Sequence, residues 1–334
     1  MKKKAVLLAL LLCCTAAVLP ASAASKTSGW KKTKGQTYYY KKGKAVKGMV
    51  KIGSKTYYFD KKGRLVKKKW VKYKGKTYRT DKNGAIIKNR FINVGGKHYR
   101  MKADGTLQKG WKTFSYGKSY FGSNGVLRKG VQKIGGKVYY FTDRGVMKTG
   151  IITEGNTTYY VSKWGVVKAK RVVKNGKAKY LDANNKALSS AKAQEYEAKW
   201  NAHVVVAQIT NSKMSKEEKL LTCFRWVMSK PYITFRTFGN FDGWVPTYAN
   251  DHFTRGGGNC QSDAAAFAYL ARELGYSKIY VCVDSDGTNP RGHSWTEING
   301  KVYDPLFAEA KSFSRYYGVS YGTYELHPIL KVRV

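Results

Sequence analysis

The sequence predicts an α+β domain in its C-terminal part, preceded by an all-β solenoid of about eight β-hairpin repeats. Two observations support this prediction. Turn-forming residues, nearly all glycines, recur every 20 or 21 residues through the first half of the chain. The second half loses this period and combines helical spacing of apolar residues with alternating strand patterns. A chain of 334 residues is long enough for a repeat array and a separate domain of about 145 residues.

The first 23 residues have the three regions of a secretory signal peptide. A basic start at residues 2–4 is followed by an apolar run over residues 5–19 and by small residues up to Ala23. The apolar run is too short to span a bilayer, so we expect cleavage after Ala23, a secreted protein and no transmembrane segment. A lipoprotein signal is the alternative interpretation, because Cys13 and Cys14 lie in the apolar run.

Residues 24–188 are predicted to form the repeats. The main turn of each repeat is marked by Gly43, Gly63, Gly84, Gly105, Gly125, Gly145, Gly165 or Asn185. Five residues earlier the repeats have Tyr38, Tyr58, Arg79, Arg100, Tyr120, Tyr140, Tyr160 and Tyr180. Each repeat is predicted to be a β-hairpin that is too small to bury a face alone, so neighbouring hairpins must stack and share an aromatic core.

Nearly all of the net charge of +43 lies on the repeats. Residues 24–188 contain 43 Lys plus Arg against 6 Asp plus Glu, whereas residues 189–334 contain 17 against 14. A surface this basic binds polyanions through counterion release. For an exported protein we expect cell-wall polyanions or glycans, such as teichoic acid and peptidoglycan, and no nucleic acid. The alternative is that the lysines only keep an aromatic-rich array soluble.

The aromatic hairpin pattern resembles the cell-wall-binding repeats of bacterial surface proteins, including the choline-binding and glucan-binding types. Choline-binding repeats have Trp-Tyr-Tyr before the turn and build an aromatic cage for a cation. Here the Trp of that trio is replaced by Gln36, Thr56, Thr77, His98, Lys118, Val138, Thr158 and Ala178. The resemblance leaves Trp30, Trp70 and Trp111, which keep the other Trp of the pattern, as candidate ligand-facing aromatics.

The chain then changes composition. Residues 189–202 are predicted to be a linker entering a short helix, and residues 203–209 a strand. Ser215-Lys216-Glu217-Glu218 is a capping box that starts a helix ending before Pro231. Residues 232–255 are rich in aromatic and turn-forming residues, which is typical of a loop that walls a substrate groove. Four side chains there are candidates to face substrate or simply to pack: Trp244, Tyr248, Asn250 and His252.

Cys260 is preceded by three glycines and Asn259. It is followed by an Ala-rich segment that is predicted to be helical up to Gly275. Backbone N–H groups at the start of a helix favour the thiolate form of such a cysteine. Without the signal peptide three cysteines remain, and an odd number indicates at least one free thiol rather than a disulfide framework. Cys223, in a helical pattern, and Cys282, in an alternating strand, are predicted core residues, with a disulfide between them as the alternative.

Residues 292–298 alternate like a strand, Asn299-Gly300 is a two-residue hairpin turn, and residues 301–305 form the returning strand. This turn pairs Ile298 with Lys301, Glu297 with Val302, Thr296 with Tyr303 and Trp295 with Asp304. Because side chains alternate faces along a strand, His293 and Asp304 are then diagonal neighbours on one face. The turn therefore predicts contact between an imidazole and a carboxylate.

Gly-Asn-Cys before an Ala-rich helix, Gly-His-Ser-Trp-Thr-Glu-Ile and Val-Tyr-Asp-Pro together resemble the transglutaminase-like superfamily. The resemblance implies a papain/transglutaminase-like catalytic fold for residues 203–334. It also implies a triad in which Cys260 attacks an amide carbonyl, His293 exchanges protons and Asp304 orients the histidine. Asn259, Gln261 and a side chain of the preceding loop are unranked candidates for a second oxyanion donor.

The implied activity is acyl transfer through a Cys260 thioester, at the cell wall. Water would resolve the thioester in a peptidase or amidase, and an amine would resolve it in protein-glutamine crosslinking; we expect hydrolysis. The alternative is a non-catalytic surface adhesion or wall-binding protein with a degenerate enzyme-like domain. No cofactor or metal is expected, because residues 284–287 lack the third acidic position and the terminal Glu of a calcium loop.

Overall fold

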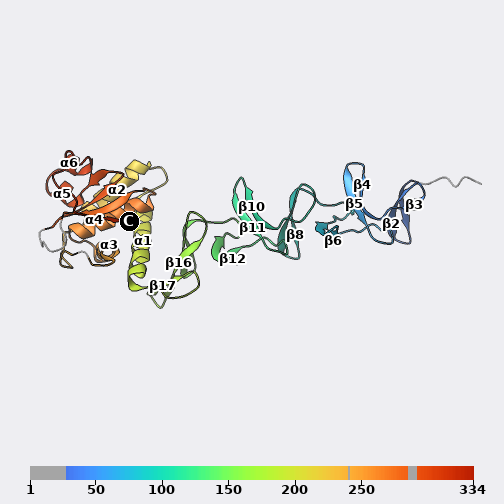
Figure 1. Ribbon diagram of the computed structural model, residues 1–334, viewed down its shortest axis with the longest axis horizontal. Helices are drawn as coiled ribbons and strands as arrows, with labels where there is room; N and C mark the ends of the chain where they lie inside the picture. The colour runs from blue at the N-terminus through green and yellow to red at the C-terminus, as the bar shows by residue number, and fades with distance from the viewer. Residues whose placement is uncertain (1–27, 240, 285–291) are drawn as a thin grey trace, which may run out of the picture. The chain divides into compact units, whose positions relative to one another are not determined.

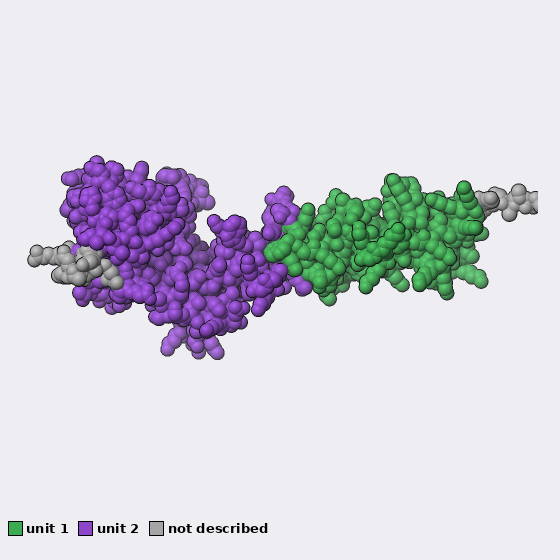
Figure 2. Space-filling view, in the orientation of Figure 1, with its two compact units in different colours: residues 1–112, 120–127 green, residues 113–119, 128–334 purple. Residues whose placement is uncertain are grey.

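A computed structural model describes residues 28–239, 241–284 and 292–334 (Figure 1). The predicted signal peptide and most of the acidic segment 284–287 lie outside the described residues. The chain divides into two compact units (Figure 2). One contains the described residues up to 112 with residues 120–127, and the other contains residues 113–119 and 128–334. None of the helices described is both long and apolar enough to cross a membrane.

The described residues between 29 and 182 form eight β-hairpins, as the repeats predict. Their strands are β1 (Gly29–Thr33) with β2 (Gln36–Lys41), β4 (Gly48–Ile52) with β5 (Lys55–Phe59), β6 (Trp70–Tyr73) with β7 (Lys76–Arg79), β8 (Arg90–Val94) with β9 (Lys97–Met101), β10 (Gly110–Phe114) with β11 (Gly117–Phe121), β12 (Gly130–Ile134) with β13 (Lys137–Phe141), β14 (Gly150–Glu154) with β15 (Thr157–Val161), and β16 (Val167–Lys174) with β17 (Lys177–Asp182). A short strand β3 (Lys44–Ala45) extends the first hairpin, and β14 to β17 join into one four-stranded sheet.

The repeating glycine lets one repeat pack on the one before it. A β-carbon at Gly84 would lie 2.7 Å from the side chain of Leu65, and one at Gly125 would lie 2.5 Å from that of Leu107. Both glycines also have a positive φ, +85° and +77°, which a side chain makes costly. The Leu107 amide donates to the carbonyl of Thr77 at 2.9 Å, which fixes the same stacking through the backbone. The turn glycines therefore recur at the interval at which one repeat packs on the one before it.

The buried core of the repeats is centred one position beyond the repeating Tyr or Arg. The residues at that position are buried in most hairpins: Phe59, Thr80, Met101, Phe121, Phe141 and Val161. The repeating tyrosines themselves differ: Tyr140, Tyr160 and Tyr180 are buried, whereas Tyr38, Tyr58 and Tyr120 are only half-buried. The repeating tyrosines were predicted to form the core. They lie beside the core in the first repeats and within it in the last ones.

The C-terminal part is α+β (Figure 1). Its helices are α1 (Ser190–Ile209), α2 (Lys216–Met228), α3 (Trp244–Arg255), α4 (Cys260–Glu273), α5 (Pro305–Ala310) and α6 (Phe313–Tyr316). Its antiparallel sheet has the order β21 (Tyr317–Val319), β20 (Lys301–Tyr303), β19 (Ser294–Ile298), β18 (Ile279–Val283) and β22 (Leu330–Arg333). Helix α4 is buried from Cys260 to Ala271 and contacts α1, α2, α3, β18 and β19, so it is the central element of this core.

The strand predicted at residues 203–209 is wrong, because α1 continues through it to Ile209. Three consecutive valines at 204–206 favour a strand by propensity. In the fold, however, Ala198, Ala202 and Val205 are buried at helical spacing, and α1 packs on α3 and α4. Tertiary packing of this face therefore overrides the β preference.

The loop predicted over residues 232–255 is also wrong in its second half, where α3 begins at Trp244. Pro246 lies in the first helical turn, where its missing N–H costs no hydrogen bond. The helix ends at Gly256, which has a left-handed φ of +81°. By contrast, the capping box at Ser215, the helix from Cys260 and the strand containing Cys282 are confirmed.

Candidate active site

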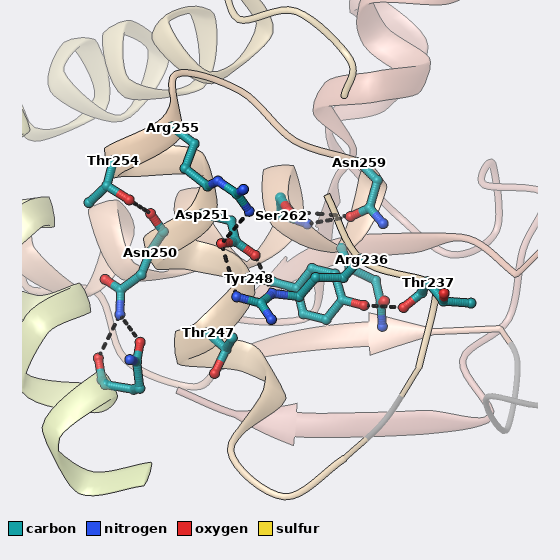
Figure 3. Close-up of polar contacts among 12 residues, drawn as sticks. Arg236, Thr237, Thr247, Tyr248, Asn250, Asp251, Thr254, Arg255, Asn259 and Ser262 are labelled. Atoms are coloured by element: carbon teal, nitrogen blue, oxygen red, sulfur yellow. Dashed lines mark hydrogen bonds and ion pairs between the residues drawn. The ribbon is translucent and has the colours of Figure 1, made fainter. Parts of the chain in front are cut away.

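Cys260 is the first residue of α4, as the sequence predicts. The Asn259 side chain caps the helix by accepting from the Ser262 amide at 3.1 Å and from the Ser262 hydroxyl at 3.3 Å (Figure 3). Gly258 allows this tight approach, because a β-carbon there would lie 2.1 Å from the Ser262 side chain. The sulfur is therefore held at the end of the helix dipole by its own local sequence.

The hairpin after Gly292 has the predicted register for three of the four pairs. Asn299 and Gly300 form the turn with φ of +53° and +82°, and the observed pairs are Ile298 with Lys301, Glu297 with Val302 and Thr296 with Tyr303. The fourth expected pair, Trp295 with Asp304, is wrong, because strand β20 ends at Tyr303. Asp304 instead begins α5, and its Oδ1 accepts from the Phe307 amide at 3.1 Å.

His293 and Asp304 are nevertheless in direct contact. His293 Nε2 lies 2.7 Å from Asp304 Oδ2, and the two side chains are almost completely buried. The same carboxylate oxygen accepts from the Tyr324 hydroxyl at 2.8 Å. The Phe307 ring stacks on the imidazole with centroids 4.0 Å apart. Three partners around one carboxylate and one aromatic wall fix the orientation of the imidazole.

Two further contacts hold the histidine strand in place, and the first of them joins it directly to the cysteine helix. The Thr296 hydroxyl donates to the Ala264 carbonyl of α4 at 2.7 Å, which joins β19 to the turn after Cys260. The His293 amide donates to Asp284 Oδ1 at 2.5 Å. As a result, the Cys260 Sγ lies 3.9 Å from the Gly292 carbonyl oxygen, next to His293.

The electrostatics of His293 reflect both neighbours. Burial lowers the pKa of His293, but hydrogen bonds and charge interactions with Asp304 and Cys260 outweigh it and raise the pKa to about 10. A protonated imidazole beside a sulfur stabilises a thiolate by ion pairing. His293 is thus hydrogen-bonded to Asp304 and interacts with Cys260, so the imidazole has the carboxylate and the sulfur as its two polar neighbours.

The other two thiols lie in the core and are free. Cys223 and Cys282 have no exposed surface, and all three described cysteines are unpaired. Burial raises the pKa of Cys223 and of Cys282 to about 12. The disulfide considered as an alternative is absent, and neither thiol has the setting of a nucleophile.

The four candidate side chains of the 232–255 segment are buried on α3 and pack within the domain. The Tyr248 hydroxyl donates to the Thr237 carbonyl at 2.6 Å, and Asn250 Nδ2 donates to the Gln194 carbonyl of α1 at 3.0 Å (Figure 3). Arg236 forms two bonds to Asp251, at 2.5 Å and 3.2 Å. The contacts of Tyr248 and Asp251 anchor the segment before α3 onto that helix.

The oxyanion candidates have other partners. Gln261 is fully buried, and its amide bonds both ways to the Gly239 peptide, at 3.1 Å and 3.3 Å. The Asn259 oxygen caps α4, as described above. Trp295 is fully buried and donates to the Tyr321 hydroxyl at 3.1 Å. Its ring borders His293 with centroids 6.3 Å apart, so it is both a core residue and a wall of the histidine site.

Sequence reasoning missed three groups around this site. Tyr324 follows Asp304 by 20 residues and carries no local pattern that predicts the contact. Phe307 is the third residue after the capping Asp304, a position that a helix start would have indicated. Asp263, one turn after Cys260, lies 3.0 Å from the fully buried His252, and burial raises the pKa of this carboxyl.

The aromatic candidates of the repeats lie in edge-to-face pairs. Trp30 is 46% exposed and contacts Tyr39 and, in the next hairpin, Tyr57, with ring centroids 5.1 Å and 4.9 Å apart. Trp70 contacts Tyr99 of the next hairpin at 4.9 Å. Trp111 contacts Tyr120 at 5.0 Å.

Comparison with known protein families identifies both parts of the chain. The model described as the transglutaminase-like superfamily matches residues 203–306. The choline-binding repeat matches residues 27–70 and 46–91, and the putative cell wall binding repeat matches residues 132–147. The chain carries choline-binding repeats followed by a transglutaminase-like domain. Repeats of this kind indicate a cell-wall-associated protein. No curated protein sequence matches the chain.

Several solved structures are similar to parts of the chain. Choline binding protein F from Streptococcus pneumoniae is 24% identical over 49% of this chain and 58% of its own, with a TM-score of 0.40. CbpJ from Streptococcus pneumoniae TIGR4 is 24% identical over 49% of this chain and 66% of its own, with a TM-score of 0.41. The modular autolysin LytC from Streptococcus pneumoniae is 18% identical over 74% of this chain and 58% of its own, with a TM-score of 0.36. The chain thus spans between 58% and 66% of the length of these structures.

Proposed function

We propose that the transglutaminase-like domain is a cysteine-dependent acyl-transfer enzyme that acts on an amide bond, and that the repeats hold it at the cell wall. The observation that carries the proposal is that Cys260, the first residue of a buried helix, interacts with His293, which is itself hydrogen-bonded to Asp304. In this proposal the protein is secreted after removal of residues 1–23, the repeats cover residues 24–188, a linker and helix cover 189–202, and the enzyme covers 203–334.

The geometry supports a specific division of roles. Because Asp304 holds His293 Nε2, Nδ1 is the ring nitrogen left to exchange a proton with Cys260. The sulfur attacks the amide carbonyl carbon, and His293 gives its proton to the leaving nitrogen as the C–N bond breaks. The acyl group is then a thioester on Cys260. Water or an amine attacks the thioester, His293 takes up its proton, and the thiolate leaves.

Thiol alkylation tests this proposal without knowledge of the substrate. At about pH 6 an unassisted thiol reacts slowly, because almost all of it is protonated. We expect iodoacetamide to label Cys260 at this pH, and His293→Ala to slow that labelling by roughly tenfold or more. Peptide mass spectrometry identifies the labelled residue, and Cys260→Ala is the control. Cys223 and Cys282 are fully buried, so we expect iodoacetamide not to label them in the folded protein. Equal labelling of the wild type and His293→Ala across pH would favour the alternative of a degenerate, non-catalytic domain.

The repeats favour an anionic ligand over choline. The Arg79 guanidinium lies 5.4 Å from the ring centre of Trp70, and the Arg100 guanidinium lies 5.4 Å from that of Phe91. In these two hairpins the protein's own cations thus lie against rings that would otherwise be open to a quaternary ammonium group. This arrangement and the excess of lysine support teichoic acid, peptidoglycan or a related anionic glycan as the partner.

Wall binding should therefore depend strongly on salt. We expect the full-length Cys260→Ala protein to bind purified cell walls at an ionic strength of about 0.1 M and to be largely released at about 1 M, because the screening length falls from about 10 Å to 3 Å. Sedimentation with walls at each salt concentration measures the bound fraction. Binding that resists salt but is reversed by free choline would show an aromatic cage instead.

A further inference from the structure

A cavity in the compact unit that contains Cys260 is lined at the other end of α4 from that residue. It has a volume of about 410 Å³, is open to solvent, and is lined by β14, β15 and β16 of the last hairpins and by helices α1 and α4. Its most informative lining residues are Tyr160, Tyr196, Tyr269, Lys168, Lys199 and Arg272. The volume is within the range of small-molecule sites.

The walls of this cavity are fixed by direct contacts. The Tyr160 hydroxyl donates to the Tyr196 carbonyl at 2.9 Å, and the two rings lie 4.8 Å apart. Tyr160 also belongs to a buried cluster with Ala169 and Tyr180 that packs on Tyr196 and Trp200 of α1. The last hairpins are thus joined to the helix that forms the other wall, and the cavity is already formed without a ligand.

The lining carries more positive than negative charge. Lys199 pairs with Glu195, but the same carboxylate also binds Lys192 at 2.8 Å. Burial and the charges of Arg272 and Lys192 lower the pKa of Lys199, against the opposing effect of Glu195. Among the described carboxylates none lies within ion-pair distance of Arg272.

Among the residues that the structure describes, Glu273 is the carboxylate that lines the cavity, and it already has a partner. Glu273 Oε1 lies 2.7 Å from His203 Nδ1, and its pairing with that imidazole raises the pKa of His203, although burial opposes it. Glu273 therefore offers little compensation to Arg272, Lys199 and Lys168. The lining therefore has a net positive charge that its own carboxylate does not neutralise.

The cations come from different directions. Lys168 is on β16, Lys199 on α1 and Arg272 on α4. A planar carboxylate is matched by one guanidinium fork, whereas the oxygens of a tetrahedral phosphate point to several donors at once. The three cations also repel a quaternary ammonium group, although tyrosines line the cavity. We propose that this cavity binds a phosphate ester carried on a sugar or polyol.

A neighbouring cavity shares part of this lining. It has a volume of about 540 Å³, shares Tyr269 and Arg272 with the first, and adds the basic Lys192 and Arg333 together with the acidic Glu195 and Asp242. Arg272 therefore lines both cavities, and the excess of positive charge belongs to the first. The second cavity leaves room for a phosphate ester that is part of a longer chain as well as for a free one. The proposal does not involve Cys260, so it is independent of the proposed acyl transfer.

Titration calorimetry on the full-length protein tests the proposal, with glycerol 3-phosphate as the probe and glycerol, choline and glucuronate as comparison ligands. We expect glycerol 3-phosphate to bind at one site and the comparison ligands to bind more weakly. Arg272→Gln, which keeps a polar side chain of similar length, should weaken glycerol 3-phosphate binding by roughly tenfold. Lys213→Ala is the matched control, because it also removes one exposed positive charge, at a position outside both cavities, and should leave the affinity unchanged.

The outcomes separate the hypotheses. Equal affinity in the wild type and Arg272→Gln, or tighter binding of choline or glucuronate than of glycerol 3-phosphate, would overturn the phosphate site. Competition by a purified phosphodiester wall polymer would assign the site to the polymer, and its failure would assign the site to free phosphate esters; both results uphold the phosphate chemistry. Unchanged iodoacetamide labelling of Cys260 in Arg272→Gln shows that the domain is folded and keeps the two proposals distinguishable.

Discussion

Cys260→Ala is expected to lower turnover of an amide substrate by about 10⁴-fold or more, because removal of the nucleophile eliminates the covalent route. The measurement is incubation of the protein with peptide, wall and amine substrates, followed by mass spectrometry of the products. Cleavage with incorporation of water shows hydrolysis, and incorporation of the amine shows transfer. A thioester adduct trapped on Cys260 after a rapid acid quench would assign the intermediate directly.

Cys223→Ala is the matched control for this loss. It removes a thiol from the core of α2, so it should reduce stability by about 1 kcal/mol and leave turnover near the wild-type level. Turnover that survives in Cys260→Ala but falls in Cys223→Ala would contradict the assignment of the nucleophile. Loss in both variants together with a lowered melting temperature would point to unfolding, and a Cys260→Ser variant then separates chemistry from packing.

Local patterns predicted the backbone structure around Cys260 and His293 correctly. The glycines and Asn259 before an Ala-rich segment place Cys260 at a helix start, and the Asn299-Gly300 turn fixes the register of the histidine strand. Both features depend on backbone conformations that only a few residue types adopt readily. Helix starts and tight turns of this kind can therefore be predicted from a few neighbouring residues.

Contacts between distant segments could not be predicted in the same way. Tyr324 reaches Asp304 only because the chain after α6 returns to the sheet. The valines at 204–206 form part of a helix because α3 and α4 supply a surface for it. Likewise, the cavity between the last hairpins and α1 exists only after both parts have packed. In each case the deciding energy comes from tertiary packing, which no short window of sequence contains.

The second large effect is expected for Asp304→Asn. In the wild type the Asp304 carboxylate accepts from His293 Nε2 and so fixes which ring nitrogen faces Cys260. An amide can present its NH₂ group there and favour the wrong tautomer, which costs about 10⁴-fold in a comparable triad. We expect a loss of this order in kcat/KM. The substitution should be tolerated by the fold, because the remaining Asn oxygen can still cap α5 by accepting from the Phe307 amide.

The pH profile distinguishes an orienting role for Asp304 from a purely structural one. Asp304 is one of the two neighbours that raise the pKa of His293 to about 10, so its replacement by a neutral amide should lower that pKa. If the proton on His293 is required, the activity of Asp304→Asn must fall at a lower pH on the alkaline side than that of the wild type.

Tyr324→Phe is the matched variant for Asp304→Asn, because it removes one neutral hydrogen bond from the same carboxylate oxygen and keeps the negative charge. It should cost no more than about tenfold in kcat/KM and leave the alkaline limb of the profile nearly in place. If Asp304→Asn retained activity within about twofold and also kept the wild-type pH profile, Asp304 would be only the cap of α5. The pair Cys260 and His293 would then act without an orienting carboxylate. An alkaline limb that shifts in Asp304→Asn but not in Tyr324→Phe would instead show that the negative charge of Asp304 supports the protonated His293.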